Sequence, residues 1–596
     1  MNIDEIRHVL RTKLAHLLQS APGSKDLVIG SNLTKALDRI AGVSFLKSHD
    51  VDKIFILDPV QKSLPGGSSR FYFVRSEMRT VKCIADHINA DLSQGIKRSN
   101  TIIFVPRKLH VCEMILEHEG VFGQITIEEF PLDLIPLDRD LMSMEMPEFF
   151  GSFYQDSDET WLHTVSSSLV NFQTLFGRIP NVYCIGGGAK MVHHLMKTLQ
   201  GLTGEDVHPG EVGNLVIIDR DVDMVSPLCS PVTYEALLDE TFSINCSFIE
   251  FGSEVVGKDQ SVKKLLTSHD EIYEQIRNRH FSNVFGYLSN KAKELQVGYD
   301  KKNSLKTVGD MKDFVANDLK GLKQQHKALS YHIGACEVIM KRKAKMDFEE
   351  HIKVEHSLLE GTDLKESITY VEECINKQAS MVPLLKLMCL LSLTQDGLSS
   401  STYRSLKTQF LQSYGFEHLL SFFNLKKLGL LVEQDLMTPG KPLAKGLAAI
   451  TRRSNFMSLS KKLSLVPKSA DEVNLKSPND MSYVFSGAYT PLSCKLVEQV
   501  LTREGFAGLD DVTKHIPGGT FANVEVKRPP ISKGRINAPM KPALKTVLVY
   551  FLGGCTFSEI AALRYLARTE AGWKIIIATT AIVTGNSLIE SVVEKC

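Results

Sequence analysis

The chain has 596 residues, and its 69 basic and 69 acidic residues give a formal net charge of zero. Hydrophobic residues make up 43% and charged residues 23% of the chain, proportions that exclude a disordered or collagen-like protein. The neutral charge also argues against a protein that binds nucleic acid through its bulk charge.

Cysteine usage and apolar runs indicate the compartment. Eleven cysteines are scattered without a CxxC pair, which favours a reducing, cytoplasmic compartment over a disulfide framework. The N-terminus lacks the apolar core and cleavage site of a signal peptide. The densest apolar run, Leu384 to Leu393, contains Lys386 and is half the length of the ~20 residues that cross a bilayer. We therefore predict a soluble chain whose membrane contact is indirect.

The first part of the chain alternates between helical and strand periodicity. An amphipathic helix opens it, and helical patterns separate most of the strands that follow. The predicted strands are residues 27–30, 53–57, 70–75, 101–106 and 125–130. This repetition predicts a mostly parallel sheet covered on both faces, which we assign to a first α/β domain over residues 1–155.

A second α/β pattern is split in two. Strands are predicted at 181–186 and 214–219, and the pattern then stops until strands at 546–554 and 573–580. Two βα units cannot bury enough surface alone, and their apolar strands need neighbours on both sides. We therefore expect the C-terminal strands to complete the sheet begun at 181–219.

The domain plan follows from this split. A discontinuous α/β domain covers residues 156–225 and 484–596, and a helical domain covers residues 226–483. Two stretches with weak periodicity, 433–480 and 516–545, are predicted linkers because they are rich in Pro, Lys or other polar residues. The predicted fold class is α/β plus α.

Two glycine-rich turns follow strands and open helices. CIGGGAK at 184–190 places Gly186–Gly188 where a phosphate could bind a helix N-terminus, and FLGGCTF at 551–557 has the same setting. Neither matches GxGxxG or the P-loop. Tight strand-to-helix turns explain both, with nucleotide binding as the alternative.

Three alternating carboxylates, Asp219, Asp221 and Asp223, end a predicted strand and could hold Mg²⁺. Arg220 lies among them, so structural Asp–Arg pairing is the favoured interpretation. HExxH, GxSxG and metal-ligand histidine spacing are missing. We predict no catalytic residue, metal or cofactor, and no enzyme; the alternative is a nucleotide-dependent α/β enzyme that uses Gly186–Gly188 and the three aspartates.

The most informative stretch is helical. Apolar residues recur in a 4-3 spacing from Val315 to Met340, with His326 as the one polar break. A second helical pattern runs from Val284 to Tyr299. The polar stretch between them predicts a long antiparallel helical hairpin within about residues 268–345.

The hairpin is basic. Residues 291–345 contain 13 Lys or Arg and 6 Asp or Glu, a formal charge of +7 on a neutral chain. Such a hairpin suits an acidic helical partner, and a solvated helix face is the alternative interpretation.

Several segments resemble the SM family, the Sec-one/Munc-eighteen-like regulators of SNARE-mediated membrane fusion. They are residues 132–150, 216–242, 484–501 and 549–567. Residues 280–289, 319–337 and 403–420 are similar to the vacuolar protein sorting-associated protein 33 branch of that family, in its B form. The resemblance implies an arch of three domains that uses its α/β scaffold without nucleotide chemistry.

The resemblance also implies SNARE proteins as partners. SNARE helices would lie along the hairpin and the cleft between domains one and three. The candidate SNARE-binding residues, chosen for charge and position, are Lys301, Lys302, Lys306, Lys312, Lys320, Lys323 and Lys327.

A Vps-sixteen-like subunit is the second implied partner, in the B branch the apical–basolateral polarity regulator. It would dock on the later part of the helical domain. The candidate residues are Tyr403, Tyr414, Phe416, Leu419, Phe422, Phe423 and Leu430; ordinary core packing is the alternative. Small GTPases of recycling endosomes would be reached through this complex, on late endosomes, recycling endosomes and lysosomes. A further hypothesis is a scaffold that binds the subunit but no SNARE.

Overall fold

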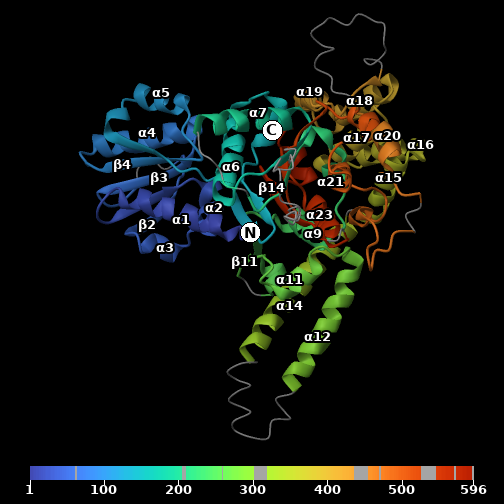
Figure 1. The fold of residues 1–596 in the computed structure, drawn as a ribbon, viewed down its shortest axis with the longest axis horizontal. Helices are drawn as coiled ribbons and strands as arrows, with labels where there is room; N and C mark the ends of the chain where they lie inside the picture. Colours follow the sequence, from blue (N-terminus) through green and yellow to red (C-terminus); the bar gives the residue numbers. More distant parts are fainter. Residues whose placement is uncertain are drawn as a thin grey trace, which may run out of the picture.

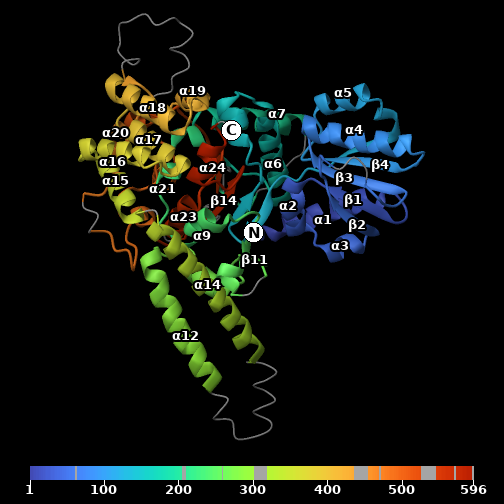
Figure 2. The ribbon, with the colours of Figure 1, turned by 180° about the vertical axis from the view of Figure 1, so that it is seen from behind.

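The structure is a computed structural model that describes residues 1–60, 64–203, 208, 210–257, 260–300, 319–345, 347–434, 454–468, 472–524, 545–569 and 572–593. Figure 1 shows one α/β unit at one side, a second in the middle and helical layers at the other side, with two helices projecting from the rest. Figure 2 shows the same arrangement from behind. The predicted fold class, α/β plus α with a projecting hairpin, is confirmed.

The first sheet has five parallel strands in the order β2-β1-β3-β4-β5. The strands are β1 Lys25–Ile29, β2 Val51–Ile56, β3 Ser69–Arg75, β4 Ser99–Val105 and β5 Ile125–Glu129. Its helices are α1 Asp4–Gln19, α2 Thr34–Ile40, α3 Val43–Lys47, α4 Met78–Ser93 and α5 His110–His118. β1 and β3 are buried along their whole length, as expected of parallel strands covered on both faces. The five strands predicted here are confirmed.

The second sheet has seven strands in the order β12-β8-β9-β13-β14-β7-β6. The strands are β6 Ile135–Asp138, β7 Leu141–Ser143, β8 Asn181–Ile185, β9 Asn214–Asp219, β12 Thr520–Val524, β13 Thr546–Leu552 and β14 Lys574–Thr579. Its helices are α6 Thr160–Phe176, α7 Gly187–Thr203, α21 Leu492–Arg503, α22 Asp510–Thr513, α23 Phe557–Thr569 and α24 Gly585–Glu590. β13 pairs in parallel with both β9 and β14, so the C-terminal strands complete the sheet that β8 and β9 begin.

Three strands of the second sheet are not predicted by the sequence pattern. β7 pairs with β14 and with β6, so residues 1–155 contribute strands to both sheets, and the expected boundary at 155 does not divide them. β12 lies antiparallel to β8 at the sheet edge, inside the expected linker 516–545. These strands are short, and β6 contains Pro136, which weakens its strand pattern.

The other expected linker, residues 433–480, is also partly structured. Within its described part, α20 (Phe456–Leu463) buries Phe456, Leu459 and Leu463. Residues 435–453 and 525–544 of the two expected linkers lie outside the described residues.

The helical region packs beside the second sheet (Figure 1). Its helices are α8 Val225–Leu228, α9 Tyr234–Phe242, α10 Ser253–Val256, α11 Glu271–Ile276, α12 Val284–Asp300, α14 Leu319–Lys345, α15 Phe348–Glu360, α16 Leu364–Asn376, α17 Met381–Thr394, α18 Ser400–Tyr414 and α19 Leu419–Lys427. A two-stranded antiparallel ribbon, β10 Phe248–Phe251 with β11 Val262–Leu265, lies at the base of the projecting helices. The densest apolar run forms α17, a core helix in which Lys386 is buried and lies 3.8 Å from Glu240. Among the described residues, no helix combines the length and apolarity needed to cross a bilayer.

Buried ion pairs join the helical region to the second sheet. Arg564 on α23 contacts Asp140 (2.8 and 3.0 Å), which follows β6, and Glu235 on α9 (2.8 Å). Arg277, after α11, contacts Asp138 on β6. The burial of Arg564 and Asp140 opposes their charges, but their ion pair outweighs it and lowers the pKa of Asp140 to about 2. The base of the projecting helices is therefore held rigidly on the sheet.

Candidate partner-binding surfaces

The projecting helices α12 and α14 form the predicted hairpin (Figures 1 and 2). Val284, Leu288 and Leu295 on α12 are buried in one cluster with Leu329 and Cys336 on α14. The apolar seam therefore seals α12 against α14, and the same cluster packs the base of α14 against α9, α10 and α11. The exposed faces that remain are open to solvent or a partner.

The seven-residue repeat does not hold to its end. Met340, its last expected member, is 58% exposed, whereas Ile339 is fully buried. A straight α-helix has 3.6 residues per turn and drifts out of a strict 3.5-residue repeat. His326, the polar break in the repeat, is exposed, and Val315 lies outside the described residues. Within the described residues, the strict repeat therefore does not continue to the end of α14, although α12 and α14 pair as the predicted hairpin.

Three of the seven basic candidates lie on α14. Lys301, Lys302, Lys306 and Lys312 lie outside the described residues, and Lys320 stands in the first turn of α14. Lys323 and Lys327 are exposed, and neither forms an ion pair with a described residue. The Lys327 ammonium lies 5.8 Å from the centre of the Tyr331 ring. These two cations are therefore available to a partner.

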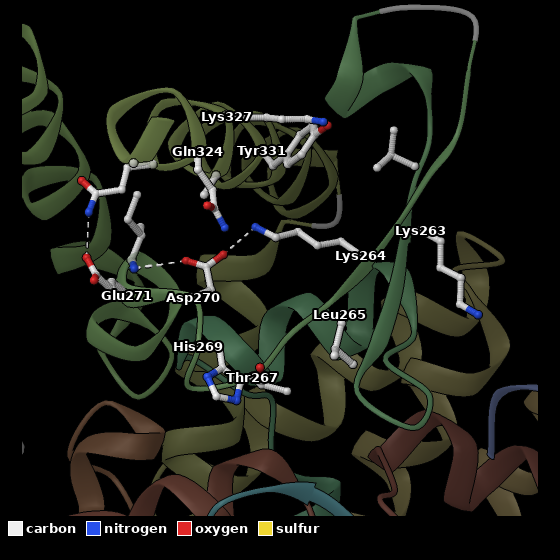
Figure 3. A pocket seen from close by; sticks show the side chains of 15 residues that line it. Lys263, Lys264, Leu265, Thr267, His269, Asp270, Glu271, Gln324, Lys327 and Tyr331 are labelled. Atoms are coloured by element: carbon white, nitrogen blue, oxygen red, sulfur yellow. Dashed lines mark hydrogen bonds and ion pairs between the residues drawn. The ribbon is translucent and has the colours of Figure 1, made fainter. Parts of the chain in front are cut away.

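A groove of about 560 Å³ runs beside Lys327, between β11, α11 and α14 (Figure 3). Lys264 from β11 and Asp270, at the start of α11, meet across its floor, with Nζ and Oδ2 2.6 Å apart. Lys327 and Tyr331 border it from α14. The groove is part apolar and edged with cations, which suits an extended or helical acidic segment.

The floor of the groove is fixed by a buried histidine. Burial lowers the pKa of His332, so its neutral ring donates from Nε2 to Asp270 (3.3 Å) and accepts the Tyr234 hydroxyl at Nδ1 (2.9 Å). Burial opposes ionisation of Asp270, but His332 and Lys264 outweigh it and hold the pKa of this carboxyl well below its ordinary value. Asp270 therefore stays charged and anchors Lys264.

The sequence pattern missed this groove. The hairpin repeat covers only α12 and α14, whereas Lys264 and Asp270 come from a ribbon and a one-turn helix outside it. One sequence signal could have located Asp270, because aspartate is a preferred N-cap residue. Its side chain accepts hydrogen bonds from the backbone N–H groups of Ile272 and Tyr273 at the start of α11.

The glycine turn at 184–190 is filled by the protein itself. The Asp219 carboxylate accepts a hydrogen bond from the Gly188 amide (2.6 Å) and another from the Tyr154 hydroxyl (2.5 Å). Gly186 has a φ of +103°, and a Cβ there would lie 2.4 Å from the Asp219 Cβ. The helix N-terminus, where a phosphate would bind, is therefore capped by a side chain of the same chain.

The three aspartates do not gather into one site. Asp219 faces the start of α7, whereas Asp223 accepts hydrogen bonds from the Ser226 hydroxyl (2.6 Å) and the Ser493 amide (2.9 Å). Asp221 is only partly buried. In the part of the chain that the structure describes, no group of acidic, histidine or cysteine side chains has metal-site geometry. The arrangement favours the structural interpretation over the nucleotide alternative.

Arg220 pairs across the sheet with Glu559 of α23, at 2.7 and 2.8 Å. Both side chains are fully buried. Burial opposes each charge, but the pair outweighs it, so the pKa of Arg220 is raised and that of Glu559 is lowered. Glu559 also accepts the Thr556 amide (3.0 Å) at the turn that follows Gly554. The second glycine turn and the aspartate run thus belong to one structural network.

A second surface lies on α19 and on the short helix η8 (Phe416–His418) that precedes it. Phe416, Leu419, Leu420 and Phe423 are between 47% and 66% exposed. Their spacing of i, i+3, i+4 and i+7 places them on one helical face. An exposed face of four large apolar side chains is typical of a protein–protein interface.

Three partner-subunit candidates are corrected by their burial. Tyr403, Phe422 and Leu430 are at most 6% exposed and belong to the core, so they cannot meet a partner without unfolding. Tyr414 is half-buried, and its hydroxyl donates to the Ala379 carbonyl (2.6 Å). Phe416, Leu419 and Phe423 remain surface candidates, and the sequence prediction omitted Leu420.

Comparisons with known proteins place these features in context. The model of the Sec1 family matches residues 25–591. Vacuolar protein sorting-associated protein 33B of Danio rerio is 46% identical, covering 99% of this chain and 97% of that protein, and the Homo sapiens protein of the same name is 45% identical with the same coverage. Vacuolar protein sorting-associated protein 33A of Rattus norvegicus is 34% identical, covering 100% and 98%.

Solved structures share the fold. The Unc18–syntaxin 1 complex from Monosiga brevicollis matches with a TM-score of 0.60 at 18% identity, covering 98% of both chains. The SM protein Vps45 in complex with the Qa SNARE Tlg2 matches with a TM-score of 0.59 at 14% identity, covering 99% of this chain and 98% of that one.

Proposed function

The chain belongs to the Sec1 family, as the sequence resemblance implied, and on this premise we propose that it is a non-enzymatic SNARE-binding subunit that templates or proofreads SNARE assembly. It acts with a Vps-sixteen-like partner in vesicle docking and fusion on endosomal and lysosomal routes. The observation that carries the proposal is the sealed hairpin, whose outward lysines Lys323 and Lys327 pair with no described carboxylate.

Related complexes support the class of partner. Unc18 is solved with syntaxin 1, and Vps45 with the Qa SNARE Tlg2. Holding SNARE helices in register on a rigid hairpin would lower the entropic cost of starting their coiled coil. The ion pairs of Arg564 and Arg277 supply that rigidity at the base of the hairpin.

The exposed face of α19 supports the second partner. It lies at the opposite end of the molecule from the hairpin in both views, so a Vps-sixteen-like subunit bound there leaves the hairpin accessible. We assign this place to the apical–basolateral polarity regulator, with small GTPases of recycling endosomes reached through the complex. Late endosomes, recycling endosomes and lysosomes are the proposed sites of action.

Co-expression of the full chain with a Vps-sixteen-like subunit tests the proposal. We expect a stoichiometric complex on size exclusion that binds an assembled SNARE bundle with an affinity that falls as salt rises. A complex that forms but binds no SNARE would support the scaffold hypothesis. Calorimetric binding of Mg²⁺-nucleotide, lost in Asp219→Ala without unfolding, would favour the enzyme alternative and contradict the proposal.

A further inference from the structure

A second concave site lies behind the base of the hairpin, away from the groove of Figure 3. It has a volume of about 580 Å³ and is walled by the end of α11, the end of α23, residues 475–478 and the segment that leads into α12. Four cationic side chains line it, from segments far apart in the sequence. They are Arg139, Arg279, Lys476 and Arg568.

The lining is electrostatically unbalanced. Glu274 is the one carboxylate among the described lining residues. It forms ion pairs with both Arg139 and Arg277. The Arg277 Nη2 lies 2.7 Å from the Glu274 Oε2. Arg279, Lys476 and Arg568 form no ion pair with a residue that the structure describes. Three cations therefore line one cavity without an acidic partner, although Arg279 also lies over the Tyr287 ring (4.9 Å). A concave surface lined by one sign of charge attracts an anion.

A buried amide points to the same conclusion. Asn278 lines the cavity and is 8% exposed. Its Oδ1 lies 3.4 Å from the Nη1 donor of Arg564, which fixes which end of the amide is oxygen. Its Nδ2 donor is buried with no hydrogen-bond partner in the described structure. The Nδ2 atom itself is closed off from solvent. Native proteins rarely leave such a donor unsatisfied, and a turn of this amide toward the cavity would present it to an anionic oxygen.

We propose that this cavity binds a compact anion with two or more phosphate groups, such as a phosphorylated inositol. A single phosphate would neither fill the volume nor neutralise three cations, and guanidinium groups are well suited to phosphate oxygens. Tyr483 and Tyr565 also line the wall, and the Tyr483 hydroxyl donates to the Asn278 carbonyl (3.0 Å), which fixes this part of the wall. Because the site joins α23 and α11 to the segment that leads into α12, an occupied cavity would stiffen the attachment of the hairpin.

Calorimetry on the full chain with inositol hexakisphosphate tests the site. We expect saturable binding with one site per chain, at least about ten-fold tighter than inorganic phosphate. Arg568→Gln and Lys476→Gln should each weaken it about five-fold or more, since charge-assisted contacts are lost. Both side chains are exposed, so these variants should fold normally. Lys365→Gln, an exposed lysine of α16, is the matched control and should bind as the wild type does.

Vesicles separate the two sources of such a ligand. Sedimentation with vesicles that contain a phosphatidylinositol bisphosphate, competed by its soluble headgroup, would assign the site to a lipid. Binding of the soluble anion without vesicle binding would assign it to a free polyphosphate. Absent saturable binding, or wild-type affinity in an Arg568→Gln/Lys476→Gln double variant, would overturn the proposal.

Discussion

Two regions of this molecule carry conspicuous charge, and they use it in opposite ways. The charges of Arg220 and Glu559 are fully buried and pair with each other. On the outer hairpin, Lys323 and Lys327 are exposed, and neither forms an ion pair with a described carboxylate. The comparison teaches that a charge that stabilises the fold differs from one available to another molecule in whether it forms an ion pair within the chain, and not in its residue type.

The same distinction separates motif from function. The glycine turn and the aspartate run have the sequence appearance of a nucleotide site, yet Asp219 caps the Gly188 amide that a phosphate would need. The hairpin has no recognisable motif, yet beside a groove it exposes lysines that form no ion pair with a described carboxylate. Four variants, each with its control, can break or sharpen this contrast.

The largest effect is expected at the buried pair. Glu559→Gln leaves the Arg220 guanidinium buried without its counter-charge, which should destabilise the protein by about 3–5 kcal/mol. Thermal unfolding followed by fluorescence measures this loss as a lower midpoint. The chain should lose its SNARE affinity only to the extent that it unfolds.

A double variant provides the control for this pair. Arg220→Met/Glu559→Leu removes both charges and should recover much of the stability, because a buried ion pair often contributes little over apolar packing. Equal destabilisation by the single and double variants would show that other contacts of Glu559, such as that with Ser493 (2.6 Å), matter more than the pair.

The apolar face of α19 should give the next largest effect. Leu420→Asp/Phe423→Asp places charges at the centre of the proposed interface and should weaken the Vps-sixteen-like subunit about 100-fold or more. Quantitative co-purification measures the loss. Because both side chains are exposed, the midpoint of unfolding should change little.

Val43→Asp is the matched control for this surface. Val43 is 53% exposed on α3 of the first domain, so it tests charge on an apolar surface residue elsewhere. If the control variant lost the subunit equally, the specificity of the α19 face would be refuted.

A buried carboxyl that forms no ion pair with a described cation makes the stability of the protein depend on pH. Burial, beside Glu235 and Glu240, raises the pKa of Asp239 to about 7, although the Ile244 amide donates to it (2.8 Å). The folded protein therefore holds a proton that the unfolded chain releases near 3.8. Stability falls as pH rises from about 4 to about 7, and it stays lowered above that range.

Asp239→Asn should remove this dependence. We expect the variant to gain about 2–3 kcal/mol of stability relative to the wild type on going from pH 5 to pH 8, measured as the difference in thermal midpoint at the two pH values. Asp511→Asn, at an exposed carboxylate, should show no such change. A gain of the same size at both pH values would contradict the raised pKa.

The sequence could predict the architecture because burial patterns are local. Five strands of the first sheet, the joined second sheet and the α12–α14 hairpin all follow from runs or repeats of apolar residues. β12 could not be predicted, since an edge strand with exposed Phe521 has neither an apolar run nor clean alternation.

The partner surface shows why site residues were harder. The stretch from Phe416 to Leu430 carries two apolar stripes, and periodicity cannot tell which one faces the core. The structure buries Phe422 and exposes Phe423 one position later. The direction of each stripe depends on where α18 and α19 pack, which is a tertiary property. Gly186 and Asp219 are 33 residues apart, and their contact was likewise invisible in the sequence.

The smallest effect is expected at the hairpin lysines, and it is the sharpest test of the contrast. Lys323→Glu/Lys327→Glu should weaken binding to an assembled SNARE bundle about ten-fold, since exposed ion pairs contribute little individually. It should also flatten the salt dependence of the affinity, while the unfolding midpoint stays unchanged. Lys365→Glu on α16 controls for net charge. If reversal lowered stability instead of affinity, these lysines would be structural charges like Arg220, and the distinction between the two regions would fail.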